Sequence, residues 1–418
     1  MLIITYYWPP SGGSGVQRWL KFVKYFREFG IEPIVLTVHP EQAVYPIMDE
    51  TLLHEIPEGV RVVYTDAKSP LDFYKKARKK NVPHTGFTNE EKTGLMDKIM
   101  RFIRGNFFIP DARVGWNKFA LAAAEKIIQE EQIDSIVTTS PPHSTQLIGL
   151  ALKQKYKIQW LADLRDPWTE IYYNQLLFRT ALAKKKDKRL ESNCIKQADT
   201  VVVVSEDIKR MFANGNEVLT HKIHVIPNGF DEADFAKIER AKNEQQKVIR
   251  YIGNLGEQYP TEGLLTVFSN LIASDNSWKM SFIGNAPQRI KQQVIERNLE
   301  THIDFMSYVA HSKAIEYMKS ATVLLLIIPE IANNKGILTG KLFEYIATGN
   351  PILCIGPEDG DAAKILNEFE NCGCFSPENI ALAFDWLKNS TFDTIETSEK
   401  SQQYSRKNLT KRISELVR

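Results

Sequence analysis

Residues 2–26 read LIITYYWPPSGGSGVQRWLKFVKYF, and this stretch predicts a strand, a loop and a helix in that order. Leu2–Tyr6 is a short β-rich run, and a loop of Pro, Ser and Gly follows it. Apolar residues at helical spacing then run from Val16 to Phe26, and Gly30 marks the end of the helix. A strand, a glycine-rich turn and a helix in this order are typical of the first unit of a parallel α/β sheet.

The same alternation continues through the first half of the chain. Strands are expected at 34–38, 135–139, 158–161 and 200–204, and helices at 116–129, 144–155 and 178–198. Alternation of this kind implies parallel strands joined by right-handed crossovers. We therefore predict a doubly wound α/β domain.

A second alternating series begins after the polar stretch 231–247, which indicates a domain boundary near that point. We predict two Rossmann-like domains. The first spans 1–222, the second spans 223–397, and a terminal helix within 398–418 packs back on the first domain. Ligands of such domains bind outside the carboxyl ends of the strands, so the loops that follow strands are the candidate sites.

Composition excludes several classes of protein. The 418 residues are 43% hydrophobic and 25% charged, which is typical of a globular chain and not of a disordered or coiled-coil one. The net charge of +2 gives no overall field that would attract nucleic acid, and we expect no nucleic-acid partner. No apolar run approaches the roughly 20 residues of a membrane span, and the first residues lack the features of a signal peptide, so we expect a cytoplasmic protein.

Glycine-rich loops are the first candidate anion sites. Gly12 and Gly13 precede the first helix, where backbone N–H groups can approach a phosphate; the alternative is a simple tight bend. Gly253, Asn254 and Gly284 follow strands of the second domain and repeat this chemistry.

The stretch 336–351, GILTGKLFEYIATGNP, carries the richest site chemistry. A helix that starts near Thr339 and Gly340 would direct its positive end and Lys341 at a phosphate. Glu344, one turn later, could accept hydrogen bonds from ribose hydroxyls. The alternative is an exposed helix with a solvated Lys/Glu face.

The first domain offers further polar residues after strands. His143 follows Ser140-Pro141-Pro142 at a helix start, and the segment 163–168 reads DLRDPW. The charges of that segment form either an internal ion-pair cluster or a polar wall of the ligand cleft. Asp359-Gly360-Asp361 matches a short metal-binding pattern of sugar transferases, but it is also ordinary turn chemistry, and we predict no metal and no cofactor.

Taken together and in order, five motifs resemble family 4 glycosyltransferases of the GT-B fold over nearly the whole chain. They are Gly12-Gly13, Ser140 to His143, Val225 to Asp231, Tyr251 to Leu255, and Phe343 to Pro351. The resemblance implies a retaining transferase that takes a sugar from a nucleotide-diphosphate donor. It implies that the second domain holds most of the donor and the first domain most of the acceptor.

The resemblance also implies roles for single residues. Glu344 matches the glutamate that binds the donor ribose, Thr339 and Gly340 match backbone groups at the diphosphate, Gly12 and Gly13 match the loop over the phosphates, and His143 matches the histidine near the transferred sugar. We expect His143 and Lys341 to be the catalytic residues, without a metal. We place Arg113, Asp163 and Asp166 on the acceptor side.

The chain departs from the family pattern at three places. Gly336 stands where the first glutamate of the usual E-x7-E pair belongs, so a carboxylate that reads donor-sugar hydroxyls is missing. Asn254 and Glu262 stand at or near the places of an Arg and a Lys that neutralise the diphosphate. We expect Lys341 and Arg18 to compensate for the missing positive charges at the diphosphate.

The region 68–118 is basic, with twelve Lys or Arg against five Asp or Glu, and it includes the run Lys75-Lys76-Ala77-Arg78-Lys79-Lys80. Residues 96–109 mix apolar and basic side chains. This pattern is typical of a helix at the surface of an anionic membrane, and equally of a helix packed on the core with a solvated basic edge. The first interpretation predicts peripheral binding to the inner face of the plasma membrane.

We therefore expect a metal-independent hexosyl transferase. Its acceptor would be a glycan or a lipid-linked molecule in the synthesis of cell-surface polysaccharide, lipopolysaccharide or glycolipid. Two alternatives remain: a sugar-nucleotide epimerase of the same fold, which needs no acceptor, and a non-catalytic protein that binds nucleotide sugars.

Overall fold

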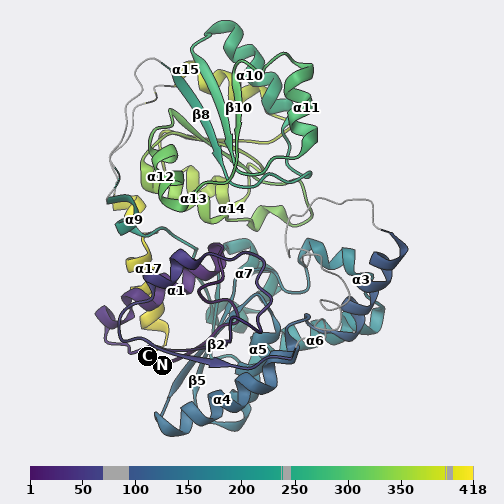
Figure 1. Cartoon of the computed structure of the whole chain (residues 1–418), viewed down its shortest axis with the longest axis vertical. Helices are drawn as coiled ribbons and strands as arrows, with labels where there is room; N and C mark the ends of the chain where they lie inside the picture. Colours follow the sequence, from purple (N-terminus) through teal and green to yellow (C-terminus); the bar gives the residue numbers. More distant parts are fainter. Residues whose placement is uncertain (69–93, 237, 239–245, 391, 393–398, 418) are drawn as a thin grey trace. The chain divides into compact units, whose positions relative to one another are not determined.

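The chain folds as two α/β units (Figure 1). The computed structural model describes residues 1–68, 94–236, 238, 246–390, 392 and 399–417. The first unit comprises Met1–Pro227 and Arg406–Arg418, and the second comprises Asn228–Ser405.

The first unit contains a sheet of seven parallel strands in the order β3-β2-β1-β4-β5-β6-β7. The strands are β1 (Leu2–Ile4), β2 (Ile34–Val38), β3 (Arg61–Thr65), β4 (Ser135–Ser140), β5 (Gln159–Leu164), β6 (Thr200–Val203) and β7 (Ile223–Val225). The helices are α1 (Ser14–Phe26), α3 (Leu95–Phe107), α4 (Asn117–Glu130), α5 (Ser144–Lys155), α6 (Ala181–Gln197), α7 (Glu206–Ala213), α8 (Glu217–Lys222) and α17 (Arg406–Leu416).

Successive residues of each strand face opposite sides of this sheet, as the two-residue period of a strand requires. Ile3 packs in a core with α1 and α17, and its neighbours Leu2 and Ile4 pack in the core formed with α4 and α5 (Figure 1). Leu409 and Ile413 of α17 are fully buried in the first of these cores. The last helix of the chain is thus an integral part of the first unit.

The second unit contains six parallel strands in the order β10-β9-β8-β11-β12-β13. The strands are β8 (Lys247–Ile252), β9 (Trp278–Ile283), β10 (Ile303–Met306), β11 (Val323–Ile327), β12 (Ile352–Ile355) and β13 (Cys372–Phe375). The helices are α9 (Glu232–Ala236), α10 (Glu262–Ser274), α11 (Gln288–Glu296), α12 (His311–Lys319), α13 (Gly340–Thr348), α14 (Asp361–Leu366), α15 (Ala381–Asn389) and α16 (Glu399–Gln402). Helices α10, α11 and α15 share one core with this sheet, and α12, α13 and α14 share the other (Figure 1).

The predicted α/β class with two doubly wound sheets is confirmed, but the domain boundaries need correction. The first unit ends at Pro227 and not at residue 222, because β7 pairs with β6 in the first sheet. Within the expected terminal helix 398–418, α16 belongs to the second unit and only α17 packs with α1. Among the described residues, no helix is both long and apolar enough to cross a bilayer.

A buried ion pair lies beneath α1. The guanidinium Nη2 of Arg18 is 3.0 Å from Oδ1 of Asp163 in β5, and both side chains are fully excluded from solvent. The other carboxylate oxygen accepts hydrogen bonds from Trp19 Nε1 and Thr139 Oγ1, both at 2.7 Å. Arg18 Nη1 also donates to the Pro227 carbonyl at 2.7 Å. These contacts join α1, β4, β5 and the end of the first unit's main segment.

Replacement of Asp163 by Asn should destabilise the protein strongly, because it leaves the buried Arg18 charge without a counter-charge. We expect a loss of about 3–5 kcal/mol in the free energy of unfolding, measured by urea denaturation. The matched control is Glu131→Gln, which removes the carboxylate of the half-exposed pair with Arg61. That change should cost at most about 1 kcal/mol. Equal effects of the two substitutions would contradict this role of the buried pair.

Candidate functional site

Two glycines bring the chain close to Lys341 at the carboxyl ends of β8 and β9. Gly253 follows β8 with φ of 128°, and Gly284 follows β9 with φ of 126°. A Cβ on Gly253 would lie 2.6 Å from Lys341 Nζ, and a Cβ on Gly284 would lie 2.4 Å from the Gly253 carbonyl oxygen. Both positions therefore require glycine, in conformation and in space.

Lys341 is a cation without a carboxylate partner. Its Nζ donates to the Tyr251 hydroxyl at 2.8 Å and lies 4.0 Å from the centre of the Tyr251 ring. Among the described residues, no carboxylate forms an ion pair with it. Burial lowers the pKa of Lys341 to about 7, and the nearby Glu344 only partly opposes this effect. An anion bound here would stabilise the charged form of Lys341, which burial destabilises.

The start of α13 adds further groups that suit an anion. Thr339 is the residue before the helix, and among the described residues its buried Oγ1 has no hydrogen-bond partner. The first N–H groups of a helix have no partner within the helix, and the helix dipole makes this end positive. Thr339, Gly340 and Lys341 therefore form an anion cradle, a name used below for these three residues.

Glu344 lies one turn further along α13. Its Oε1 is 2.9 Å from Nε2 of His311 at the start of α12. Within the described part of the chain, its Oε2 has no hydrogen-bond partner, and the side chain is 19% exposed. Glu344 can therefore still accept hydrogen bonds from ligand hydroxyls. Sequence reasoning missed His311, because the two residues are far apart in the chain and no local motif joins them.

Asn254 connects the two glycine loops. Its Oδ1 accepts a hydrogen bond from the Asn285 N–H at 3.2 Å, so this side chain holds the loop after β8 to the loop after β9. It was predicted to bind the donor, and the structure gives it this positioning contact.

In the first unit, Gly12 and Gly13 play different parts. The Gly12 N–H donates to the Ile47 carbonyl at 2.9 Å, so it is already used within the protein. Gly13 precedes α1 and has φ of 101°, and no described atom beyond its chain neighbours lies within 4 Å of the position that a Cβ would occupy there. A Cβ at Gly15 would overlap the Arg165 guanidinium, which therefore lies against the start of α1. Arg165 was not predicted as a site residue.

His143 is a buried, neutral imidazole. Its ring stacks on Trp168 with centres 5.0 Å apart and planes inclined by 10°. Neither ring nitrogen has a hydrogen-bond partner among the described residues. Burial, aided by Arg165 and Arg179, lowers the pKa of His143 to about 3. The residue can thus position a ligand by a hydrogen bond, but it carries no charge near neutral pH.

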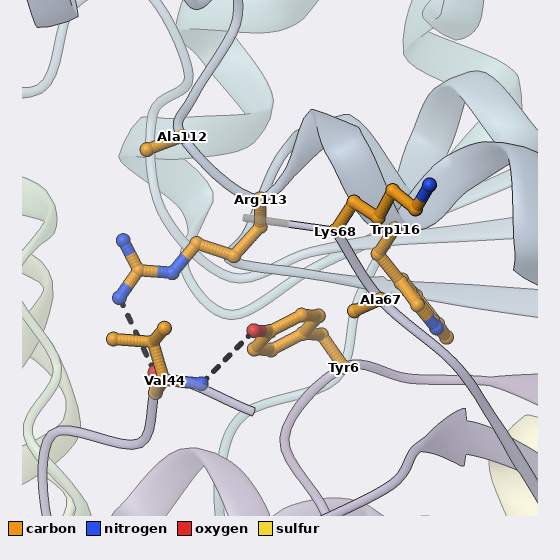
Figure 2. Close-up of a pocket in the computed structure, with 7 residues that line it drawn as sticks. All are labelled: Tyr6, Val44, Ala67, Lys68, Ala112, Arg113 and Trp116. Carbon is orange, nitrogen blue, oxygen red and sulfur yellow. Dashed lines mark hydrogen bonds between the residues drawn. The ribbon is translucent and has the colours of Figure 1, made fainter. Parts of the chain in front are cut away.

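The three residues predicted to face an acceptor differ in their surroundings. Asp163 is fully buried in the ion pair with Arg18, so its assignment to the acceptor side was wrong, and Arg18 is likewise not available to compensate at the diphosphate. Asp166 is partly buried, and burial raises its pKa despite the nearby Arg165. Arg113 lines a pocket of the first unit (Figure 2).

The two aspartates of the DxD pattern each lie beside a lysine. Asp359 pairs with Lys335, and Asp361 pairs with Lys364 at 3.0 Å. Among the described residues, no group of His, Cys, Asp and Glu side chains could hold a metal ion. The absence of a metal requirement stays a prediction.

Lys341 should titrate near neutral pH in lysine-selective NMR, and inorganic pyrophosphate should raise its pKa, because an anion stabilises the charged form. The resonance should be missing from the Lys341→Arg variant, which serves to assign it. A pKa that stays the same when pyrophosphate is added would contradict the anion cradle.

Two family models match adjacent parts of the sequence. One is described as Glycosyltransferase Family 4 and covers residues 71–234, and the other is described as Glycosyl transferases group 1 and covers residues 232–408. No curated protein matches the sequence.

Solved structures share the architecture of the whole chain. Sucrose-phosphate synthase from Thermosynechococcus elongatus has a TM-score of 0.64 at 13% identity, over 100% of this chain and 98% of that one. Anabaena HepE in complex with UDP and glucose has a TM-score of 0.61 at 12% identity, over 99% and 98%. A putative UDP-N-acetylglucosamine 2-epimerase from Listeria monocytogenes has a TM-score of 0.53 at 11% identity, over 99% and 94%. With matches to both halves of the sequence and two parallel sheets, the chain belongs to glycosyltransferase family 4 and has the GT-B fold.

Proposed function

We propose that the protein is a retaining hexosyl transferase that moves a sugar from a nucleotide-diphosphate donor to a glycan or lipid-linked acceptor. The observation that carries the proposal is the anion cradle, in which Lys341 is partly buried and, among the described residues, has no carboxylate partner in an ion pair. A diphosphate supplies the negative charge that this site lacks. Glu344, one turn along the same helix, is placed to accept from a ribose.

The cradle suits the chemistry of glycosyl transfer. The departing diphosphate gains negative charge as the bond to the sugar breaks, and fixed N–H dipoles with Lys341 can stabilise that charge. We propose that this occurs without a metal. The acceptor hydroxyl would attack on the face that the diphosphate leaves, so no protein nucleophile is needed. His143, with two free ring nitrogens, would hold the transferred sugar by hydrogen bonding.

Two of the three departures from the family pattern, Gly336 and Glu262, bear on how the donor would be recognised. Gly336 has no side chain to read sugar hydroxyls, so the hexose would be recognised by other groups. Glu262 is 75% exposed and lies 3.5 Å from Arg297, so its charge is partly compensated. HepE was solved with UDP and glucose, and UDP is therefore the first nucleotide to test here.

We also propose that the protein binds the surface of an anionic membrane, where a lipid-linked acceptor would be found. Leu95, Met96, Ile99 and Phe102 form an exposed stripe on α3, with exposed fractions from 42% to 76%. Lys98 lies beside this stripe on the same helix. The predicted run Lys75 to Lys80 lies outside the described residues.

Helix α3 is held in place at its other end. The Asn106 side chain donates to the Phe178 carbonyl at 3.2 Å and accepts from the Thr180 N–H at 2.8 Å. Nearby, α6 carries an exposed Leu182 and the lysines 184–186. Apolar side chains beside cations fit the interface of an anionic bilayer.

The donor proposal predicts stabilisation by one nucleotide in a thermal-shift titration with UDP, GDP and ADP in the presence of EDTA. A ligand at about 100 times its Kd should add about 2.7 kcal/mol of stability. Glu344→Ala should lose most of this stabilisation, and the exposed control Glu300→Ala should keep it. If no nucleotide stabilises the protein with or without magnesium, the donor assignment is wrong.

Turnover separates the rival activities. A transferase should incorporate labelled sugar from the sugar nucleotide into a glycan or lipid fraction. Conversion of the sugar nucleotide without an acceptor, seen by NMR, would favour the epimerase. Binding without any turnover would favour a non-catalytic protein.

The membrane proposal predicts that the protein sediments with vesicles that contain phosphatidylglycerol and not with pure phosphatidylcholine vesicles. The variant Leu95→Ser/Ile99→Ser should lose most of this binding, because apolar area is removed from the interface. Val218→Ser, at an equally exposed position of α8, should retain it. Equal losses in both variants would contradict a specific membrane face.

A further inference from the structure

A small pocket lies at the carboxyl ends of β1, β2 and β3 in the first unit (Figure 2). Tyr6 follows β1, Val44 lies on the segment after β2, and Lys68 lies beyond β3. Arg113 and Trp116 complete the lining from the segment before α4. Ligands of open α/β sheets bind at this edge of the strands.

Within the described residues, Arg113 lacks an ion pair of the kind that Arg18 and Arg179 of the same unit form. It is 8% exposed. Arg18 pairs with Asp163, and Arg179 pairs with Asp187. Within the described ranges, no carboxylate lies within ion-pair distance of Arg113. A guanidinium that lines a pocket and has no ion-pair partner there can bind an anion from outside the chain.

Burial lowers the pKa of Arg113, but Tyr7, Tyr6 and Asp111 outweigh this effect and raise the pKa overall, so the protein already favours the charged form. Arg113 Nη2 donates to the Val44 carbonyl at 3.3 Å, and among the described residues its buried Nε has no partner. Asp111, the nearby acid, accepts from the N–H and the hydroxyl of Ser144, at 2.7 and 2.9 Å. Burial raises the pKa of Tyr6 to about 12, so its phenol is neutral under physiological conditions.

The walls and the size of the pocket limit what can enter. The Tyr6 ring is edge-on to Trp116, with centres 5.5 Å apart, and its hydroxyl accepts from the Val44 N–H at 3.1 Å. The unfilled space is about 10 Å³, which is room for one oxygen-sized group. Lys68 is exposed at the rim and adds a second cation. The pocket therefore suits the end of an oxyanion and not a whole sugar ring.

We propose that this pocket binds an oxyanion carried by the acceptor, either the carboxylate of an acidic sugar or the phosphate of a phosphorylated sugar or lipid, with Arg113 as the binding residue. This inference rests on the proposed transferase function and specifies its acceptor class. A neutral glycan would leave the Arg113 guanidinium without an ion-pair partner in this pocket.

The test is calorimetric titration with two charged probes and their neutral analogues. Methyl glucuronide is compared with methyl glucoside, and farnesyl phosphate with farnesol. At least one charged probe should bind about tenfold or more tightly than its neutral analogue. Preference for the carboxylate identifies an acidic sugar, and preference for the phosphate identifies a phosphorylated acceptor. No preference in either pair would overturn the proposal.

Variants assign the binding to this pocket. Arg113→Gln should weaken binding of the charged probe about tenfold, and Lys341→Gln should leave that binding unchanged. UDP should show the opposite pattern, so a failure of the donor site and a failure of this pocket can be told apart. The urea midpoint of Arg113→Gln, measured in parallel, shows whether this variant folds. Should that variant not fold, Lys68→Ala, at an exposed position, should still weaken the charged probe. Unchanged probe binding in the folded Arg113→Gln variant, or in Lys68→Ala as its substitute, would overturn the assignment.

Discussion

The buried pair of Arg18 and Asp163 is the interaction on which the first unit depends. It neutralises two charges inside the core and satisfies Trp19 and Thr139 at the same time. Because Asp163 lies near the end of β5 and next to β4, the pair also fixes the loops that follow both strands. Arg165 then donates from Nε to the Ser140 carbonyl at 3.0 Å, and His143 follows in the same loop. The pair of Arg18 and Asp163 therefore helps to determine where the neutral His143 imidazole lies, although both side chains of the pair are fully excluded from solvent.

The sequence predicted the strands whose residues are mostly buried, such as β1, β2, β4, β5 and β6, and the longer helices beside them. It missed β3 and β13, whose residues are only partly buried. It placed β7 in the wrong domain, because a three-residue edge strand followed by a polar segment resembles a linker. The pattern of apolar residues in a sequence reflects which residues are buried, and the edge strands β3, β7 and β13 are only partly buried.

The error at Asp163 had a signal that was available. Leu161 and Asp163 lie two residues apart on one strand, so they face the same side, and that side packs against α1. A charge there requires an opposite charge on α1, and Arg18 is one. In contrast, the contacts of Glu344 with His311 and of Arg165 with Gly15 join distant segments and follow from the tertiary fold alone. Each glycine loop and the segment around Lys341 were predicted because the residues that suit an anion lie within one short stretch of sequence.

The position of α17 in the first unit has a consequence for how the protein is made. Met1–Pro227 leaves the ribosome before the second unit, and Arg406–Arg418 leaves it after the second unit. At about 5–20 residues per second, the delay is roughly ten to forty seconds. During that time the apolar residues that α17 covers have no partner, while the continuous second unit can already fold. The first unit is thus completed after the second, and a chain that stalls before residue 406 exposes an apolar face that chaperones and proteases recognise.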